Sequence, residues 1–267
     1  MSTSSNLLPR LSRQRGLAVF GAMLTAAAFG LLGLPAKAKE EPASASTQGV
    51  AQASQESARE SVTLSEEDQK AVEIFEKVGS LFMRREFSAA SALLEEVEKL
   101  KPDSVEAKMI RAGIYAETGQ IDKAREIYAK QVEANPDAFV PNFNLIELLC
   151  MQKKYAEARE GFEKLLEKFP ENDFLQFKIL LTCLAENKMT DAAIWNQKLQ
   201  RQVQTPIMIY AAAAISIRSG DLPLGKKLIL LAESQYGAGN QFLLHQSLAG
   251  INLVLQSDYP PKPEAAR

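Results

Sequence analysis

Side chains that most often carry out enzyme chemistry are scarce in this chain. It has one histidine, His245, and two cysteines, Cys150 and Cys183, among 267 residues. Catalytic triads and zinc sites need several such groups held together. The sequence shows no glycine-rich phosphate loop and no cysteine–histidine spacing typical of a metal site. It therefore predicts a protein that is not an enzyme and that holds neither a cofactor nor a metal ion.

The distribution of charge argues against nucleic acid as a partner. Lysine and arginine number 31 and aspartate and glutamate 33, for a net charge of −2. Residues 1–38 hold four basic residues and no acid, so the remainder has 27 basic against 33 acidic residues, a net charge of −6. Proteins that bind nucleic acid present a basic surface to the phosphates. We therefore expect protein or peptide partners.

Residues 1–38 have the layout of a secretory signal peptide. A cationic start is followed by residues 16–34, a run of 19 residues without charge, and then by Pro35 and Ala36-Lys37-Ala38. Small residues flanking one position are typical of a cleavage site. We expect cleavage after Ala38 and an exported protein of the periplasm or cell envelope. The alternative is an uncleaved anchor, because 19 apolar residues nearly span a bilayer. That anchor would be the one expected contact with a membrane.

Two other segments are predicted to lack a fixed fold. Residues 39–64 are rich in Ser, Ala, Gln and Glu and contain no aromatic residue, so they bury too little apolar area to offset the entropy of ordering. Residues 258–267 contain three prolines and should be extended. The folded domain is therefore predicted at residues 65–257, with the Ser65 hydroxyl capping its first helix.

Between residues 71 and 239 the sequence repeats with a period of 34. The columns that keep this step are Pro102, Pro136 and Pro170; Ala90, Ala124, Ala158 and Ala192; Phe87, Ile121, Tyr155 and Met189; and Leu94, Tyr128 and Phe162. In each unit, two stretches with helical apolar spacing are separated by a polar interruption such as Thr118-Gly119-Gln120. Each unit is therefore predicted to be a helical hairpin, in which the alanine column marks the close approach of the two helices.

These columns resemble those of the tetratricopeptide-repeat (TPR) family. The resemblance is carried best by the second unit, through Gly113, Tyr115, Gly119, Ala124, Tyr128 and Pro136. It implies an all-α fold, a right-handed superhelical solenoid of about five helix-turn-helix repeats. These repeats are predicted at residues 71–104, 105–138, 139–172, 173–205 and 206–239. The fifth has lost one residue, because Gly220, Leu222 and Gly225 stand one step early. Residues 240–256 are predicted to form a capping helix over the last repeat.

Cys150 and Cys183 fall late in the first helices of adjacent repeats. A disulfide between them would join the third and fourth repeats in an oxidising compartment. Packed helix axes stand about 8–10 Å apart, whereas a disulfide needs Cα atoms within about 7 Å. The sequence therefore favours two small buried thiols, with the bridge as the alternative. His245, in the predicted capping helix, is interpreted as a structural side chain.

The TPR resemblance places one face of the first helices on the inside of the superhelix, and this inner face is the candidate functional site. An apolar ladder follows it from repeat to repeat, with glycines and one acid beside it: Phe75, Gly79, Phe82, Met109, Gly113, Phe143, Glu147, Phe177, Leu181 and Tyr210. TPR proteins that grip C-terminal carboxylates present Lys, Arg and Asn there, so such a clamp is not expected. The ladder favours a groove for an apolar or amphipathic segment, which Glu147 would orient.

The resemblance thus predicts a non-enzymatic scaffold or adaptor for a protein partner in the bacterial envelope, similar to repeat chaperones. Two alternatives stay open. In the first, the ladder is a core covered by the chain's own tether, by its C-terminal helix or by a second copy. In the second, the same apolar face drives homodimerisation, and the protein is structural and self-associating.

Overall fold

The computed structural model describes residues 65–200, 204–237 and 241–254. That part of the chain is all-helical. Its helices are α3 (Glu66–Met83), α4 (Phe87–Leu100), α5 (Val105–Glu117), α6 (Ile121–Ala134), α7 (Phe139–Met151), α8 (Tyr155–Lys168), α9 (Asp173–Ala185), α10 (Met189–Leu199), α11 (Pro206–Arg218), α12 (Leu222–Tyr236) and α13 (Phe242–Gly250). The predicted signal peptide, tether and proline-rich tail lie outside the described residues.

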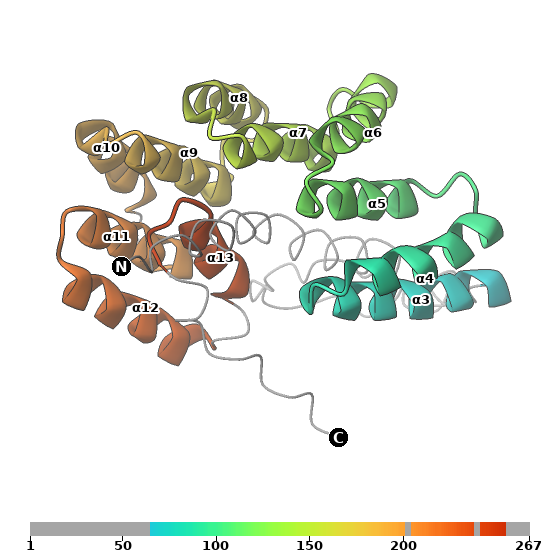
Figure 1. The fold of residues 1–267 in the computed structure, drawn as a ribbon. Helices are drawn as coiled ribbons and strands as arrows, with labels where there is room; N and C mark the ends of the chain where they lie inside the picture. Colours follow the sequence, from blue (N-terminus) through green and yellow to red (C-terminus); the bar gives the residue numbers. More distant parts are fainter. Residues whose placement is uncertain (1–64, 201–203, 238–240, 255–267) are drawn as a thin grey trace, which may run out of the picture.

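The helices pair into five successive hairpins, from α3–α4 to α11–α12, that form a curved array (Figure 1). Each predicted repeat contains one hairpin, although α3 begins ahead of residue 71. The first helices α5, α7 and α9 lie on the inside of the curve, and α6, α8 and α10 lie outside them. The all-α solenoid is therefore confirmed, and the inner face belongs to the first helices.

A column of small residues lets the two helices of each hairpin approach closely. Ala90, Ala124, Ala158 and Ala192 have no exposed surface. In the fifth hairpin the place is taken by Gly225, where an added methyl group would stand 2.3 Å from Cγ1 of Ile217. A larger side chain in this column would force the helices apart. Gly225 therefore confirms that the fifth unit is one residue short.

Two residues after each first helix ends, the chain has a residue with left-handed backbone, and these residues form a column of their own. Their φ angles are 63° at Arg85, 83° at Gly119, 63° at Lys153, 62° at Asn187 and 97° at Gly220. The left-handed conformation costs a residue with a Cβ about 1–2 kcal/mol, less for asparagine and nothing for glycine. Arg85 and Lys153 therefore hold strain that the repeat geometry imposes.

This strain predicts opposite effects for two substitutions at equivalent places. Lys153→Gly should raise the free energy of unfolding by about 0.5–1 kcal/mol, because relief of strain exceeds the added backbone entropy. Gly119→Ala should lower it by about 1 kcal/mol through strain alone, because no atom lies within 4 Å of the new Cβ. Urea unfolding of the variants measures both. Glu163→Gly, at an exposed position inside α8, should destabilise by about 1 kcal/mol; stabilisation there would contradict the explanation.

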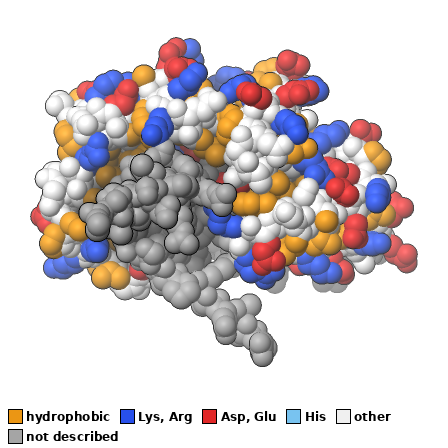
Figure 2. All heavy atoms as spheres, viewed as in Figure 1, with side chains coloured by type: hydrophobic (Ala, Val, Ile, Leu, Met, Phe, Trp, Pro, Cys, Tyr) orange, Lys and Arg blue, Asp and Glu red, His pale blue; other side chains and the backbone are white. Residues whose placement is uncertain are grey.

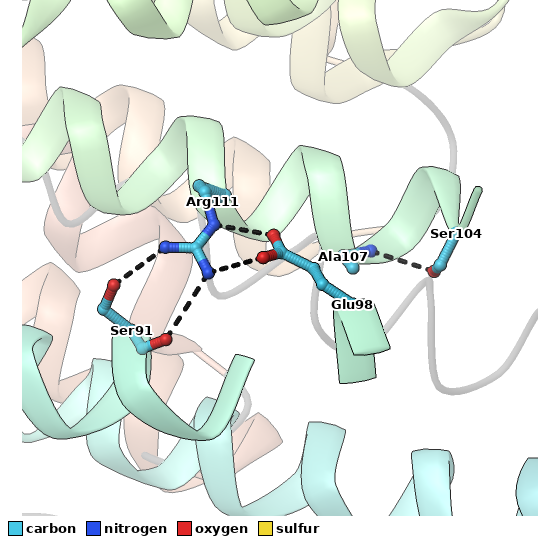
Figure 3. A network of polar contacts seen from close by, with 5 residues as sticks. All are labelled: Ser91, Glu98, Ser104, Ala107 and Arg111. Carbon is cyan, nitrogen blue, oxygen red and sulfur yellow. Dashed lines mark hydrogen bonds and ion pairs between the residues drawn. The ribbon is translucent and has the colours of Figure 1, made fainter. Parts of the chain in front are cut away.

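The joint between the first two hairpins depends on Arg111 of α5 (Figure 3). Its Nε and Nη2 donate to the two carboxylate oxygens of Glu98 on α4, at 2.6 and 2.9 Å. Its Nη1 donates to the Ser91 hydroxyl, also on α4, at 2.8 Å. This two-pronged pairing fixes the angle between the planes of the two groups. It therefore orients the second hairpin on the first.

The hydrophobic core of the described residues is divided into three clusters along the array. The first joins α3, α4 and one face of α5. The second joins the other face of α5 to α6 and α7. The third and largest runs from α7 to α13. The N-terminal hairpins therefore depend on smaller, local cores, and the C-terminal three share one.

The C-terminal helix differs from the predicted cap in length and in position. α13 has nine residues, and Asn252 turns the chain with a φ of 59° just after it. It packs against the first helices α9 and α11 on the inside of the curve, not over α12 (Figure 1). The physical reason is that Leu244 and Leu248 find a larger apolar surface there, in the third core cluster. Among the described helices, none is both long and apolar enough to cross a bilayer.

Candidate partner-binding surface

Most of the predicted groove residues are buried in this structure. Phe82, Phe177 and Tyr210 have no exposed surface, and Met109, Phe143, Glu147 and Leu181 are exposed by 8% or less. Gly113 is also buried, whereas Phe75 and Gly79 on α3 are half-buried. These side chains are therefore packed into the protein and do not line an open groove.

The ladder is also divided among the three core clusters. Phe143, Phe177, Leu181 and Tyr210 belong to the largest cluster. Met109 packs in the second, with Tyr128 and Leu148. Phe82 lies in the first, and Phe75 packs against it. The structure thus brings together the residues of α7, α9 and α11, and it separates them from those of α3 and α5.

Phe143 stands at the centre of an aromatic group that links three helices. Its ring centroid lies 5.5 Å from that of Phe162 on α8 and 5.8 Å from that of Phe174 on α9. Phe139 stacks on it one turn earlier, at 5.6 Å. Such offset and tilted ring pairs add about 0.5–1.5 kcal/mol each beyond simple burial. Phe143 therefore holds the third and fourth repeats together.

Glu147 is neutralised by a partner that sequence reasoning missed. Lys178 of α9 places its Nζ 2.8 and 3.0 Å from the two carboxylate oxygens, and both side chains are less than a tenth exposed. The expectation that Glu147 orients a bound segment is therefore corrected, because its charge is used between neighbouring first helices. The sequence signal for this pair was the separation of 31 residues between Glu147 and Lys178, which is one repeat less about one helical turn.

Glu117, about two turns after Met109 on α5, is a second acid with a buried side chain. Its side chain is 2% exposed, and its Oε2 lies 3.4 Å from Nη1 of Arg85 in the preceding repeat. Burial raises the pKa of Glu117 to about 7, although the charge of Arg85 opposes this shift. Sequence reasoning missed this group too, and the 32-residue separation is again close to one repeat.

The raised pKa of Glu117 predicts that this group makes the protein more stable at acidic than at neutral pH. Between pH 4.5 and about 7 the folded protein binds a proton that the unfolded chain has released, so stability should fall as pH rises through this window. Glu117→Gln keeps an oxygen for Arg85 and should flatten this slope, with a gain of about 1–3 kcal/mol at pH 8. Urea unfolding at pH 5 and pH 8 measures it.

The matched control is Glu126→Gln on the exposed face of the same repeat. Glu126 is exposed and pairs with Lys130, which lowers its pKa. This variant should keep the fall in stability between pH 5 and 8. An identical slope in wild type and Glu117→Gln would show that Glu117 does not titrate there.

α13 provides direct evidence of what the inner face accommodates. It packs on α9 and α11, and its Leu244 and Leu248 join the same cluster as Phe177, Leu181 and Tyr210. Gln246 and Ser247 on this helix are also buried. The chain's own C-terminal helix therefore covers this end of the ladder, as the first alternative expected. A helix with leucines four residues apart fits this surface.

Cys150 and Cys183 are free thiols, so the favoured interpretation of two unbridged cysteines agrees with the structure. Cys183 is fully buried and Cys150 half-buried. Burial raises the pKa of both thiols, which keeps them protonated and weakly nucleophilic. Among the described residues no group of three His, Cys, Asp or Glu side chains has a geometry that could hold a metal ion.

Comparison with known families identifies the repeat. Residues 81–143 and residues 143–172 match two models described as tetratricopeptide repeat. These residues include the second and third units, where the resemblance was strongest. No curated protein matches the chain.

Among solved structures, a thermophilic TPR protein of Thermus thermophilus is similar in fold. It is 16% identical, with a TM-score of 0.53, and the match covers 67% of this chain and 98% of that one. MamA from AMB-1 is 22% identical, with a TM-score of 0.40, over 62% of this chain and 93% of that one. MamA from MSR-1 is 21% identical, with a TM-score of 0.41, over 63% and 99%. The first of these supports the fold of the array.

Proposed function

The chain is a tetratricopeptide-repeat protein, and from this premise we propose that it is a non-enzymatic protein–protein interaction scaffold of the cell envelope. Its inner face, along α7, α9 and α11, binds an apolar or amphipathic helical segment of a protein partner. The observation that carries this proposal is α13, a helix already lying on that face.

The contacts that hold α13 are ones that a partner helix could also make. A nine-residue helix is not stable by itself in water, so α13 depends on its contacts with the array. Those contacts include two buried leucines, each worth about 1.5–3 kcal/mol of apolar transfer. A partner helix with a longer apolar stripe would bury more area on the same face and would displace α13.

The partner segment is selected by shape and apolarity, because the inner face offers it no free charge at Glu147. Lys178 occupies both oxygens of that carboxylate. A charged side chain placed against this pair would lose its hydration without gaining a counter-ion. The segment therefore presents leucine-like side chains at this point, with neutral polar residues beside them, as α13 does.

A peptide with the sequence of residues 241–254 tests this surface. Leu244→Asp/Leu248→Asp in the full chain should release α13, because two buried carboxylates cannot be tolerated there. The variant should then bind the fluorescent peptide at least about tenfold more tightly than wild type does. The reason is that the two leucines of the peptide can be buried in the site that α13 has left. Fluorescence anisotropy measures the affinity.

The control peptide carries serine in place of both leucines and should not bind. Circular dichroism must show that the Leu244→Asp/Leu248→Asp chain keeps its helices. Equal peptide affinity for wild type and variant would contradict a helix-binding inner face. Light scattering tests the self-associating alternative. That alternative would be favoured if the wild type had the mass of two copies and this variant had the mass of one.

The location in the envelope rests on residues 1–38. Their cationic start, uncharged run and Ala36-Lys37-Ala38 support export, with a mature chain that begins at Lys39. N-terminal sequencing of the protein from the envelope fraction tests this expectation. A chain that still starts at Met1 and resists extraction from the membrane would support the uncleaved anchor instead.

A further inference from the structure

The second helix of the last hairpin exposes an unusual amount of apolar surface. Six large hydrophobic side chains are exposed within the described residues, and four of them lie on α12: Leu222 (45%), Leu224 (43%), Leu230 (65%) and Leu231 (39%). Contiguous exposed apolar surface of this kind marks an interaction site in a soluble protein. The other exposed pair is separated, one on α5 and one on α10.

Three of these leucines occupy positions that are charged in other repeats. In α8 the places of Leu224, Leu230 and Leu231 are taken by Glu157, Glu163 and Lys164, all of them exposed. In α6 they are taken by Lys123, Ala129 and Lys130. The register follows from the small-residue column, in which Gly225 corresponds to Ala158 and Ala124. The outer face of α12 therefore departs from the pattern that keeps second helices solvated.

Leu222 is exposed for a different reason. It belongs to the apolar column of Phe87, Ile121, Tyr155 and Met189, whose members are half-buried. Each earlier second helix packs against the first helix of the next hairpin. α13 packs instead on α9 and α11, so within the described residues no following helix covers this edge of α12. The uncovered edge adds Leu222 to the three leucines of the outer face.

The charge on this face of α12 is positive. Lys226 and Lys227 are exposed between the leucines, and the described residues form no ion pair with either. Glu233, the helix's one acid, is half-buried, and burial raises its pKa. Figure 2 shows both signs of charge interspersed over much of the visible surface. At the lower left, where Figure 1 places α12, orange side chains lie beside blue ones.

We propose that the outer face of α12 docks on an anionic lipid membrane surface. The four leucines enter the boundary between headgroups and acyl chains, and the two lysines reach back to lipid phosphates through their flexible stems. At 15 residues α12 lies in the plane of the membrane and does not cross it. This surface is distinct from the inner face, so partner and membrane engage opposite sides of the array.

A second copy of the chain fits this face less well. A two-fold pairing of α12 with itself would bring four lysines together, and on each copy only the half-buried Glu233 and the capping residue Asp221 could balance them. Stacking on the acidic helix α3 would pair the charges, but α3 exposes no large hydrophobic residue among those described. The leucines also spread over about half of the helix circumference, which is wider than the stripe that helix pairing uses. A lipid surface satisfies both the leucines and the lysines.

A tryptophan at the centre of the face tests the contact directly. The full chain with Trp195→Phe and Leu230→Trp has its single tryptophan on α12. Its emission should shift to the blue and be quenched by brominated acyl chains in phosphatidylglycerol-containing vesicles. Phosphatidylcholine vesicles should give little effect, and added salt should weaken the response. This local readout is independent of any membrane contact made by residues 1–38.

Restoring the residues of α8 supplies the matched variant. Leu224→Glu/Leu231→Lys/Lys227→Glu in the same tryptophan background should reduce vesicle binding at residue 230 about tenfold or more. The control variant changes three exposed positions of α8 to glutamine: Glu157→Gln/Glu163→Gln/Lys164→Gln. It should leave vesicle binding at residue 230 unchanged. In the wild-type chain, vesicles should also protect Lys226 and Lys227 from an amine-reactive reagent, with Lys130 and Lys164 as unprotected references.

Two results would overturn the proposal. One is the absence of quenching at residue 230, together with unprotected Lys226 and Lys227 in the wild type, on anionic vesicles. The other is a blue shift that appears without lipid and grows with protein concentration, because that would assign the face to a second copy. If the tryptophan variant does not fold, the proposal is decided by the labelling of Lys226 and Lys227 in the wild type.

Discussion

The close approach of two helices at one small residue per repeat is the constraint on which the array depends. The two backbones of a hairpin approach until the flanking apolar columns meet, because the residue between them is small. These residues are Ala90, Ala124, Ala158, Ala192 and Gly225. Because Gly225 is the smallest of the five, the fifth hairpin tolerates no methyl group beside Ile217. The left-handed residue that follows each first helix sets the direction of the turn, and at Arg85 and Lys153 this conformation is strained.

Buried ion pairs then fix how one repeat sits on the next. Lys178 reaches Glu147 across the third joint, with both side chains buried, whereas across the first joint the partly exposed Arg85 reaches the buried Glu117. Removing both ions from water is costly, and a pair of apolar residues would serve stability at least as well. The Lys178–Glu147 pair nevertheless disfavours a shift in register, since either ion would be left buried alone. Such a pair therefore fixes the register of α9 against α7.

The hairpins, their boundaries and the small column followed from the sequence because they repeat, and several columns with one period leave a single register. The inner face was harder, because periodicity shows which residues share a face but not how deeply they lie. Phe143 carried the pattern of a ladder residue, yet Phe139, Phe162 and Phe174 enclose it. Lys178 and Glu117 were missed because each occurs once, without a column, and only the separation from its partner reveals it.

α13 is the element for which sequence and structure differ most, and its position determines both surfaces. A helix that continued the array would cover the apolar edge of α12 at Leu222 and leave the inner face open. With nine residues, α13 is too short to replace a first helix of 13, and its leucines pack beside Tyr210 instead. One short helix therefore covers the α9–α11 end of the inner face, and within the described residues the end of the solenoid at α12 stays uncovered.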